Sequence, residues 1–237
     1  MNGASRAIVL LSGGLDSATC LMIARGEADE VFALSFDYGQ RHRIELDRAR
    51  RLAERYGAAA HRIVRLDLPA PESSALTDSS REIPRNALGA EPIPSTYVPA
   101  RNTLFLAHAV AWGEVIGAGD IYIGANALDY SGYPDCRPEF LEAFERTSNL
   151  GTKAGVSGTL AFRICAPLLR LTKGEIVARA AALGLDFALT SSCYDPTPTG
   201  KPCGACDSCL LRAKGFRAAR LRDPLAPDDT STGVNPP

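Results

Sequence analysis

Apolar and polar positions alternate along this chain in a way that predicts strands and helices in turn. Residues 7–12 form a continuous apolar run, typical of a strand buried on both faces of a parallel sheet. The same patterning predicts further strands at residues 31–37, 61–67 and 120–126, and helices at residues 16–25, 41–56, 102–116, 137–149 and 172–183. Repeated strand–helix units favour an α/β fold, a doubly wound parallel sheet with helices on both faces.

Three of these helices carry further signals. Residues 41–56 are charged and amphipathic and end before Gly57, a residue suited to a helix C-terminus. Residues 102–116 are almost wholly apolar, which predicts a buried helix and makes His108 an expected core histidine. The helix at residues 172–183 opens with Thr172 and Glu175, the spacing of a capping box.

Two segments lack a clear period. Residues 69–100 contain six prolines and predict a long loop, a candidate for a mobile lid. The tail after Arg222 is rich in Pro, Asp, Ser and Thr, which predicts disorder. The expected organisation is a main domain at residues 1–190, a cysteine-rich helical appendage at 191–222 and a disordered tail at 223–237.

Composition narrows the function classes. The 237 residues are 46% hydrophobic and 22% charged, with a formal net charge of -1, which is ordinary for a soluble protein. No apolar run approaches the roughly 18 residues of a membrane span, and the start shows no secretory segment, so we expect a cytoplasmic protein without a membrane partner. Seven cysteines in a reducing compartment point to metal binding or catalysis rather than disulfides.

Residues 12–17 read Ser-Gly-Gly-Leu-Asp-Ser and join the first predicted strand to the first predicted helix. Backbone N–H groups at a helix N-terminus, together with the helix dipole, favour an anion such as phosphate. Gly13 and Gly14 allow the backbone to approach it closely. The loop lacks the Gly-Lys-Ser/Thr ending of a Walker motif. The alternative is an ordinary strand-to-helix turn. The segments 37–40 and 126–135 also follow predicted strands, so all three are expected at one sheet edge.

Four cysteines cluster near the C-terminal end as Cys-x9-Cys-x2-Cys-x2-Cys, namely Cys193, Cys203, Cys206 and Cys209. Four thiolates within seventeen residues suit a closed tetrahedral Zn²⁺ site, which is structural because it leaves no open position. An iron–sulfur cluster is the competing interpretation. Cys20 lies in a predicted buried helix and is expected to pack in the core.

Several longer motifs accompany the loop: Asp-Tyr-Gly-Gln-Arg-His at 37–42, Tyr-Val-Pro-Ala-Arg-Asn-Thr at 97–103, a block from Asp to Phe at 129–140, Ser-Cys-Tyr at 192–194 and Pro-Cys-Gly-Ala-Cys-Asp-Ser-Cys at 202–209. Together they resemble the 7-cyano-7-deazaguanine synthases of queuosine biosynthesis, members of the N-type ATP pyrophosphatase (PP-loop) superfamily with its Rossmann-like, adenine nucleotide alpha hydrolase fold. The resemblance spans residues 7–216. Ala100 departs from the Gly expected in many members.

The resemblance implies an ATP-dependent ligase that converts 7-carboxy-7-deazaguanine and ammonia to the nitrile and works as a homodimer on small molecules, with no nucleic acid partner. It implies ATP with Mg²⁺, for which Asp16 is a candidate ligand, and it assigns catalytic roles to Ser12, Asp16, Ser17 and Arg101. The implied ATP-binding residues are Leu10, Leu11, Ser12, Gly13, Gly14, Leu15, Asp16, Ser17, Ala18, Thr19 and Cys20. Candidate substrate contacts are Asp129, Tyr130, Tyr133, Asp135 and Glu139, with carboxylates accepting from the heterocycle edge and tyrosines stacking on it.

Several alternatives stay open at this stage. Ser17 and Asn102 are also suited to capping helices, Arg101 to an exposed helix start, and residues 129–140 to a turn. Cys136 fits either a covalent intermediate or an inert packing thiol, and His42 either a ligand contact or a solvated helix face. An enzyme with the same ATP chemistry but a different acceptor molecule is a further alternative, as in the tRNA thiolases, tRNA-lysidine synthases, GMP synthetases and NAD synthetases. A zinc module that binds nucleic acid through the basic residues at 201–222 is the alternative without catalysis.

Overall fold

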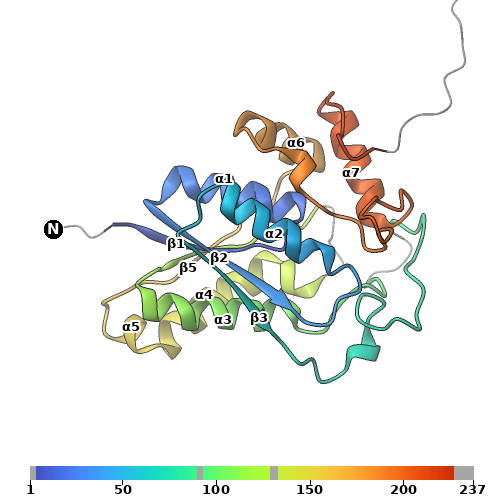
Figure 1. Ribbon diagram of the computed structural model, residues 1–237. Helices are drawn as coiled ribbons and strands as arrows, with labels where there is room; N and C mark the ends of the chain where they lie inside the picture. The colour runs from blue at the N-terminus through green and yellow to red at the C-terminus, as the bar shows by residue number, and fades with distance from the viewer. Residues whose placement is uncertain (1–3, 90–92, 129–132, 227–237) are drawn as a thin grey trace, which may run out of the picture.

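The apolar runs form one parallel sheet. The computed structural model describes residues 4–89, 93–128 and 133–226, and within them the sheet has the strand order β3-β2-β1-β4-β5 (Figure 1). Its strands are β1 (Arg6–Leu10), β2 (Glu30–Asp37), β3 (Ala60–Arg65), β4 (Asp120–Tyr122) and β5 (Arg163–Cys165), all parallel. The doubly wound fold class is confirmed. The expected strand 120–126 is cut to three residues, and β5 was not predicted from the sequence.

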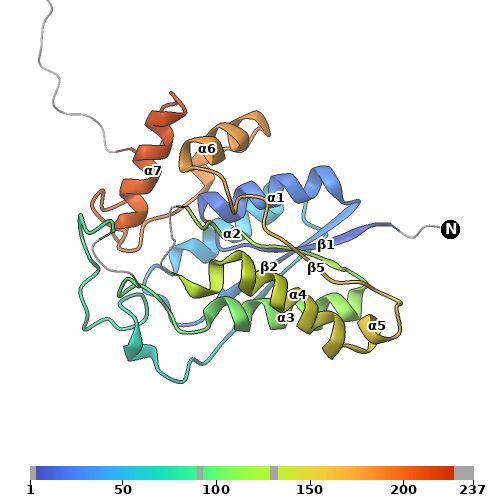
Figure 2. The ribbon, with the colours of Figure 1, turned by 180° about the vertical axis from the view of Figure 1, so that it is seen from behind.

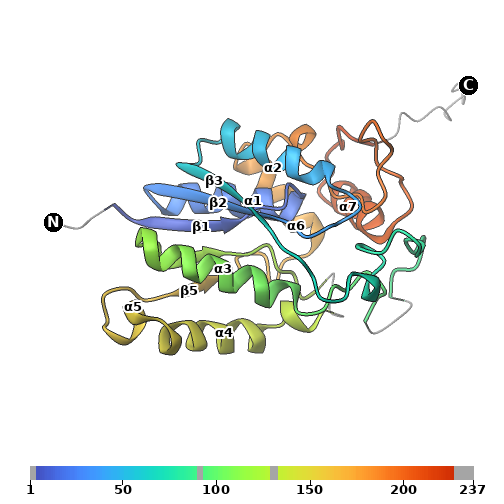
Figure 3. The same ribbon diagram turned by 60° about the horizontal axis from the view of Figure 1, so that its bottom comes forward.

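Helices cover both faces of this sheet. In Figures 2 and 3, α1, α2, α6 and α7 lie on one side of it, and α3, α4 and α5 lie on the other. Their bounds are α1 (Leu15–Glu27), α2 (Ile44–Arg55), α3 (Arg101–Ile116), α4 (Pro138–Gly151), α5 (Lys153–Val156), α6 (Lys173–Ala182) and α7 (Asp207–Ala218), and short 3₁₀ turns lie at η1 (Pro71–Ser73), η2 (Pro134–Cys136) and η3 (Phe187–Leu189). None of the helices in the described ranges has the length and apolar character needed to cross a membrane.

The alternation along β1 explains this layering. Ala7 and Val9 pack with the α1 side of the sheet, whereas Ile8 and Leu10 pack with the α3 side. All four side chains are buried. A strand buried on both faces gains from apolar residues at every position, which is why the run is continuous in the sequence. Because β1 lies at the centre of the sheet, the loop that follows it lies between the two helical layers.

The expectation that the helix at residues 102–116 is fully buried was wrong. One face of α3 packs against β1 and β4, whereas Leu104, His108 and Val115 on another face are exposed, Val115 by 80%. His108 is therefore not a core histidine, although its ring lies 5.8 Å from that of Phe36. Small and apolar residues on every side of this helix hide its 3.6-residue period, so the pattern could not show which face is exposed.

The described parts of the proline-rich segment, residues 69–89 and 93–100, are largely irregular, as predicted, but they pack against the rest of the molecule. Ser74, Ala75 and Leu76 are buried, and the Arg41 N–H donates to the Leu76 carbonyl over 2.9 Å. Farther along, the Asn86 N–H donates to the Ala205 carbonyl over 2.9 Å, beside an isolated antiparallel bridge that joins the preceding residue to the cysteine-rich region. The segment is thus tied to the body of the protein at more than one point.

Candidate active site

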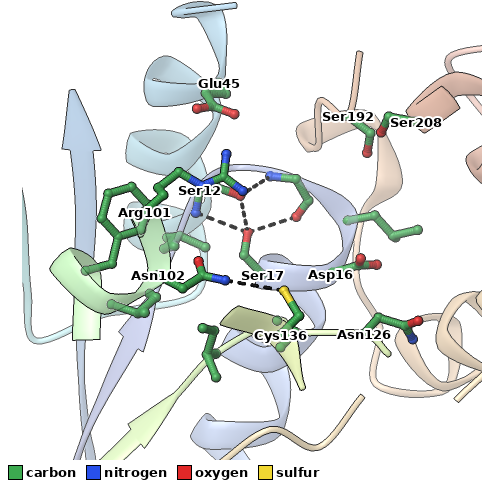
Figure 4. A pocket seen from close by; sticks show the side chains of 18 of the residues that line it. Ser12, Asp16, Ser17, Glu45, Arg101, Asn102, Asn126, Cys136, Ser192 and Ser208 are labelled. Carbon is green, nitrogen blue, oxygen red and sulfur yellow. Dashed lines mark hydrogen bonds between the residues drawn. The ribbon is translucent and has the colours of Figure 1, made fainter. Parts of the chain in front are cut away.

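A cavity of about 230 Å³ opens at the carboxyl ends of β1, β2 and β4. It lies at the point where the chain order reverses across the sheet, between β1 and β4, where open α/β sheets bind their ligands. The three segments expected at one sheet edge meet here, because Ser12, Tyr38 and Asn126 all line this cavity (Figure 4). The predicted convergence is therefore confirmed.

The loop after β1 is held by its own serines. The Ser17 hydroxyl donates to the Gly14 carbonyl over 3.1 Å, accepts from the Ser12 N–H over 3.1 Å and lies 3.0 Å from the Ser12 hydroxyl. The N-cap of α1 is Gly14, not Ser17, so the capping alternative for Ser17 does not hold. The first-turn N–H groups of a helix have no acceptor within the helix, and the first turn of α1, Leu15 to Ser17, lines the cavity. The loop therefore presents donors and hydroxyls to an anion.

Gly13 and Gly14 of the loop each favour glycine, but for different structural reasons. Gly13 has φ +88°, and a Cβ there would lie 2.2 Å from the Glu45 carbonyl oxygen and 2.9 Å from the Ala49 backbone nitrogen. Gly13 is thus needed for α2 to rest on the loop, and it does not line the cavity. Gly14 does line the cavity, which suits the close approach of a ligand.

Asp16 forms an ion pair with a lysine that the sequence analysis missed. The ammonium of Lys173, at the start of α6, lies 2.8 and 3.0 Å from the two carboxylate oxygens of Asp16, and both residues line the cavity. The predicted capping box of Thr172 and Glu175 fixes the start of α6 and so positions Lys173. The lysine escaped notice because it lies 157 positions from Asp16 in the chain and no motif joins the two residues. Its charge makes this wall of the cavity attractive to phosphate.

Of the residues expected to bind ATP, about two thirds line the cavity: Leu10, Leu11, Ser12, Gly14, Leu15, Asp16 and Ser17. The remaining ones, Gly13, Ala18, Thr19 and Cys20, do not. Cys20 is fully buried among apolar side chains, and burial raises the pKa of its thiol, so its expected packing role is confirmed.

Arg101 and a set of aromatic rings line another part of the cavity. The Arg101 guanidinium donates to the Tyr38 hydroxyl over 3.2 Å, and burial raises the pKa of Tyr38 to about 12, so this phenol stays protonated. Phe105, Tyr133 and Tyr194 also line the cavity. Arg101 points into the cavity beside Ser12 (Figure 4), so it is not the exposed arginine that the alternative interpretation required.

The candidate substrate residues are only partly in the cavity. Tyr133 lines it and bonds through its hydroxyl to Thr96 over 2.9 Å. Asp135 is buried and accepts from the Asn102 N–H over 3.0 Å, so it satisfies the first turn of α3, whereas Glu139 is exposed. Neither carboxylate lines the cavity. Asp129 and Tyr130 lie outside the described residues.

The side chains of Asn102 and Cys136 contact each other near Asp135. Asn102 lies within α3, whose N-cap is Ala100, so it does not cap that helix. Its amide nitrogen donates to the Cys136 sulfur over 3.3 Å. Burial, and next the charge of Asp135, raise the pKa of Cys136 to about 11. A protonated, buried thiol agrees with the packing role and disfavours a nucleophile.

The four clustered cysteines form a site that could hold a metal ion. One sulfur from each of Cys193, Cys203, Cys206 and Cys209 lies within 4.8 Å of the others. Backbone N–H groups point at these sulfurs, with Cys203 N donating to the Cys193 sulfur over 3.2 Å and Cys206 N to the Cys203 sulfur over 3.4 Å. The hydrogen bond from Cys193 lowers the pKa of Cys206, which favours a thiolate. The donor set fits a closed, soft-ligand metal site.

This cysteine site joins the proline-rich segment to the cavity wall. Arg85 pairs with Cys206 in an antiparallel bridge, and its guanidinium lies 3.1 Å from the Asp195 carboxylate. On the other side, α7 begins directly after Cys206 and contributes Ser208 to the cavity lining. Loss of the metal is therefore expected to loosen both the segment and the cavity wall.

The Arg85 side chain is exposed, and we expect removal of a bound metal by a chelator to free the backbone around it for cleavage by trypsin. The bridge to Cys206 and the Asn86–Ala205 hydrogen bond hold this stretch, so cleavage after Arg85 should become several times faster in the chelated protein. Mass spectrometry of the fragments measures it, with cleavage after Arg51 in α2 as the internal control. Equal cleavage after Arg85 with and without metal would show that the cysteine site does not anchor the segment.

The parallel sheet, with the Ser-Gly-Gly-Leu-Asp-Ser loop and a cavity at its switch point, defines the class as a doubly wound α/β protein. A sequence model of the family described as queuosine biosynthesis protein QueC matches residues 6–220, and the chain belongs to this family. The curated relative 7-cyano-7-deazaguanine synthase of Geobacter sulfurreducens is 57% identical over 220 residues, covering 93% of this chain and 92% of that protein. The protein of the same name from Pseudomonas syringae pv. syringae is 58% identical over 219 residues, covering 92% and 94%.

Proposed function

We propose that this chain is an ATP-dependent carbon–nitrogen ligase that converts 7-carboxy-7-deazaguanine and ammonia to 7-cyano-7-deazaguanine. The observation that carries the proposal is the shared cavity, which joins the phosphate loop at Ser12 and Ser17 to Arg101 and an aromatic wall. The family and the names of relatives at 57–58% identity support the same reaction. A flat heterocycle suits the aromatic wall, and its carboxylate suits the guanidinium.

The chemistry requires activation because a carboxylate does not react with ammonia. It is anionic, and oxide is a very poor leaving group. Attack of a carboxylate oxygen on the α-phosphorus of ATP forms a mixed anhydride and breaks the α–β phosphoanhydride bond, so pyrophosphate leaves. Ammonia then attacks the carbonyl carbon and AMP leaves, giving the amide. A second adenylation, now at the amide oxygen, allows that oxygen to depart with AMP and leaves the nitrile.

The loop and its neighbours supply charge stabilisation for both activations. The N–H groups and hydroxyls at Ser12–Ser17 are suited to hold the pyrophosphate that leaves, and Lys173 is suited to neutralise its growing charge. Arg101, which Tyr38 holds in place, is suited to orient the substrate carboxylate. Phosphate charge that develops in the cavity is stabilised by such fixed donors.

Two metal ions belong to the proposal. Cys193, Cys203, Cys206 and Cys209 would hold one Zn²⁺, which stabilises the fold of this region and takes no part in the reaction. Mg²⁺ would arrive with ATP as the counterion of its phosphates, and Asp16 is the candidate ligand, directly or through water. The Lys173–Asp16 ion pair would then exchange partners as nucleotide binds.

We also place the protein in the cytoplasm as a homodimer. Its seven cysteines are all free, as in a reducing compartment. The exposed stripe of α3, with Leu104, His108 and Val115, offers an apolar face for a second copy. Sedimentation equilibrium of the wild-type protein and of Val115→Glu tests this arrangement. A dimer that Val115→Glu leaves intact would exclude this face.

The reaction itself is tested by mass spectrometry of 7-carboxy-7-deazaguanine incubated with ammonium, ATP, Mg²⁺ and the metal-loaded protein. We expect amide to appear first and nitrile later, with AMP and pyrophosphate as the nucleotide products. Cleavage of ATP without amide or nitrile would reject the substrate and retain the loop assignment. Formation of ADP and phosphate would reject the loop assignment as well.

A further inference from the structure

A histidine and a glutamate form a buried pair in the cavity that none of the roles above uses. His42 is 6% exposed, and its Nε2 lies 3.2 Å from a carboxylate oxygen of Glu45 in the first turn of α2. The other Glu45 oxygen accepts from the side-chain amide of Gln40 over 3.0 Å. Gln40 is itself fixed, because the same amide donates to the Phe36 carbonyl over 2.9 Å. The carboxylate is thus held in one orientation.

The pair lies beside the phosphate loop. Glu45 is the residue whose carbonyl occupies the space that a Cβ on Gly13 would need, so the first turn of α2 contacts the loop directly. Both His42 and Glu45 line the same cavity as Ser12, Asp16 and Arg101. Figure 4 shows Glu45 on α2, across the loop from Ser192 and Ser208.

The second ring nitrogen of His42 is the unusual feature. Nδ1 is buried, and within the described part of the chain it has no hydrogen-bond partner. A buried polar atom without a partner costs about 1–3 kcal/mol, so such atoms call for an explanation. In a neutral imidazole one nitrogen carries the proton and the other a lone pair, and a Glu45 carboxylate oxygen 3.2 Å from Nε2 favours the proton on Nε2 and the lone pair on Nδ1. Nδ1 is therefore an unused proton acceptor within the cavity wall, next to a negative charge, and a small cation reaches it only when the side chains around it shift.

The proposed reaction needs such a group for ammonia. Near neutral pH most ammonia is ammonium, which has no lone pair and cannot attack a carbonyl. We propose that His42 and Glu45 form the ammonium site of the ligase: the Glu45 carboxylate attracts the cation, and His42 Nδ1 removes its proton. This inference rests on the proposed function and adds the residues that prepare its nucleophile.

Atoms and electrons balance in this step. One proton passes from ammonium to His42 Nδ1, and the freed lone pair forms the C–N bond at the carbonyl carbon of the acyl adenylate. The bond from that carbon to the oxygen of AMP breaks, and the electron pair leaves with AMP. The second proton leaves the new amide nitrogen for water, and His42 later returns its proton to solvent. No oxidant or reductant is needed.

The alternative occupant of this pair is the edge of the heterocycle, whose N–H groups a carboxylate can accept. One Glu45 oxygen already accepts from Gln40 and the other lies 3.2 Å from His42 Nε2, which leaves less room for a two-point contact. The lone pair on His42 Nδ1 has no role in that arrangement unless the substrate offers another donor. Tyr194, whose ring lies 5.9 Å from that of His42, closes the other side of the pair.

The test compares His42→Gln with Glu54→Gln, a change at an exposed position of α2 outside the cavity lining. Three reactions are measured on metal-loaded protein. Pyrophosphate–ATP exchange with 7-carboxy-7-deazaguanine reports adenylation without ammonia. Amide formation is measured at varied ammonium, and hydroxamate formation is measured with hydroxylamine, which is a free base near neutral pH. Glu45→Gln, a change of similar size, serves as the second variant if His42→Gln does not fold.

We expect kcat/KM for ammonium to fall about 10²-fold in His42→Gln, the scale of general base catalysis. Exchange and hydroxamate formation should fall far less, and Glu54→Gln should match wild type in all three. A raised KM for the acid in the exchange reaction would instead assign the pair to the heterocycle and overturn the inference. Equal losses with ammonium and hydroxylamine would overturn it too. If wild-type protein gives no acid-dependent exchange, it is the proposed function that fails.

Discussion

Replacing Gly13 by alanine is expected to lower kcat/KM for ATP by about 10²-fold or more, the cost of displacing catalytic groups by roughly 1 Å. The new Cβ would lie 2.2 Å from the Glu45 carbonyl oxygen and 2.9 Å from the Ala49 nitrogen, and both are backbone atoms that cannot rotate away. The φ of +88° adds strain for any side chain. The loop and α2 must therefore move apart, which displaces Ser12 and Ser17 from the cavity. Pyrophosphate–ATP exchange measures the loss.

Gly26→Ala is the matched control for this variant. Gly26 lies near the end of α1, and a Cβ there meets nothing within 4 Å, so we expect full activity and equal or higher stability. Circular dichroism of both variants separates a displaced loop from a failure to fold. A Gly13→Ala protein that is folded and exchanges pyrophosphate at the wild-type rate would contradict the packing argument for this loop.

Replacing Asp223 by alanine is expected to destabilise the protein by about 3–5 kcal/mol, because it leaves a buried charge without its partner. The Arg212 guanidinium on α7 lies 2.7 and 2.9 Å from the two Asp223 oxygens and also donates to the Thr190 hydroxyl over 2.8 Å. Arg212 is 5% exposed and lines the cavity. Because Ser191, next to Thr190, donates its N–H to the Gly13 carbonyl, we expect a weaker affinity for ATP as well.

Urea unfolding of the metal-loaded protein measures this effect as a lower midpoint. Asp47→Ala is the control, since the Asp47–Arg50 pair is more than half exposed on α2 and its loss should change the free energy of unfolding by less than about 1 kcal/mol. If both variants unfold at the same urea concentration, the Arg212–Asp223 pair does not hold the last described residues to the core.

The central elements of the fold could be predicted from the sequence because the buried positions in them mostly carry apolar residues. The run at residues 7–11 is apolar throughout, and β1 is buried on both sides. β5 gave no such signal, since three residues are too few to show a pattern and Arg163 at its start is exposed. The exposed face of α3 was hidden for the opposite reason, because apolar residues lie on both the buried and the exposed side.

The site could be predicted where a motif is local and not where contacts join distant segments. The loop at residues 12–17 and the four cysteines are short patterns with their chemistry inside them. Lys173 reaches Asp16 across 157 positions of the chain, and no spacing rule connects them. Asp135 resembled a base-reading carboxylate, but the fold uses it at the start of α3. Such choices depend on tertiary packing, which only the structure reveals.

The most direct measurement for the whole account is the transfer of oxygen from the substrate to AMP. 7-Carboxy-7-deazaguanine with both carboxyl oxygens labelled as ¹⁸O is converted with ammonium and ATP, and the nucleotides are weighed by mass spectrometry. If the loop adenylates first the acid and then the amide, each nitrile should be accompanied by two AMP molecules that carry one ¹⁸O each. Label in pyrophosphate, or unlabelled AMP beside a labelled water product, would contradict it.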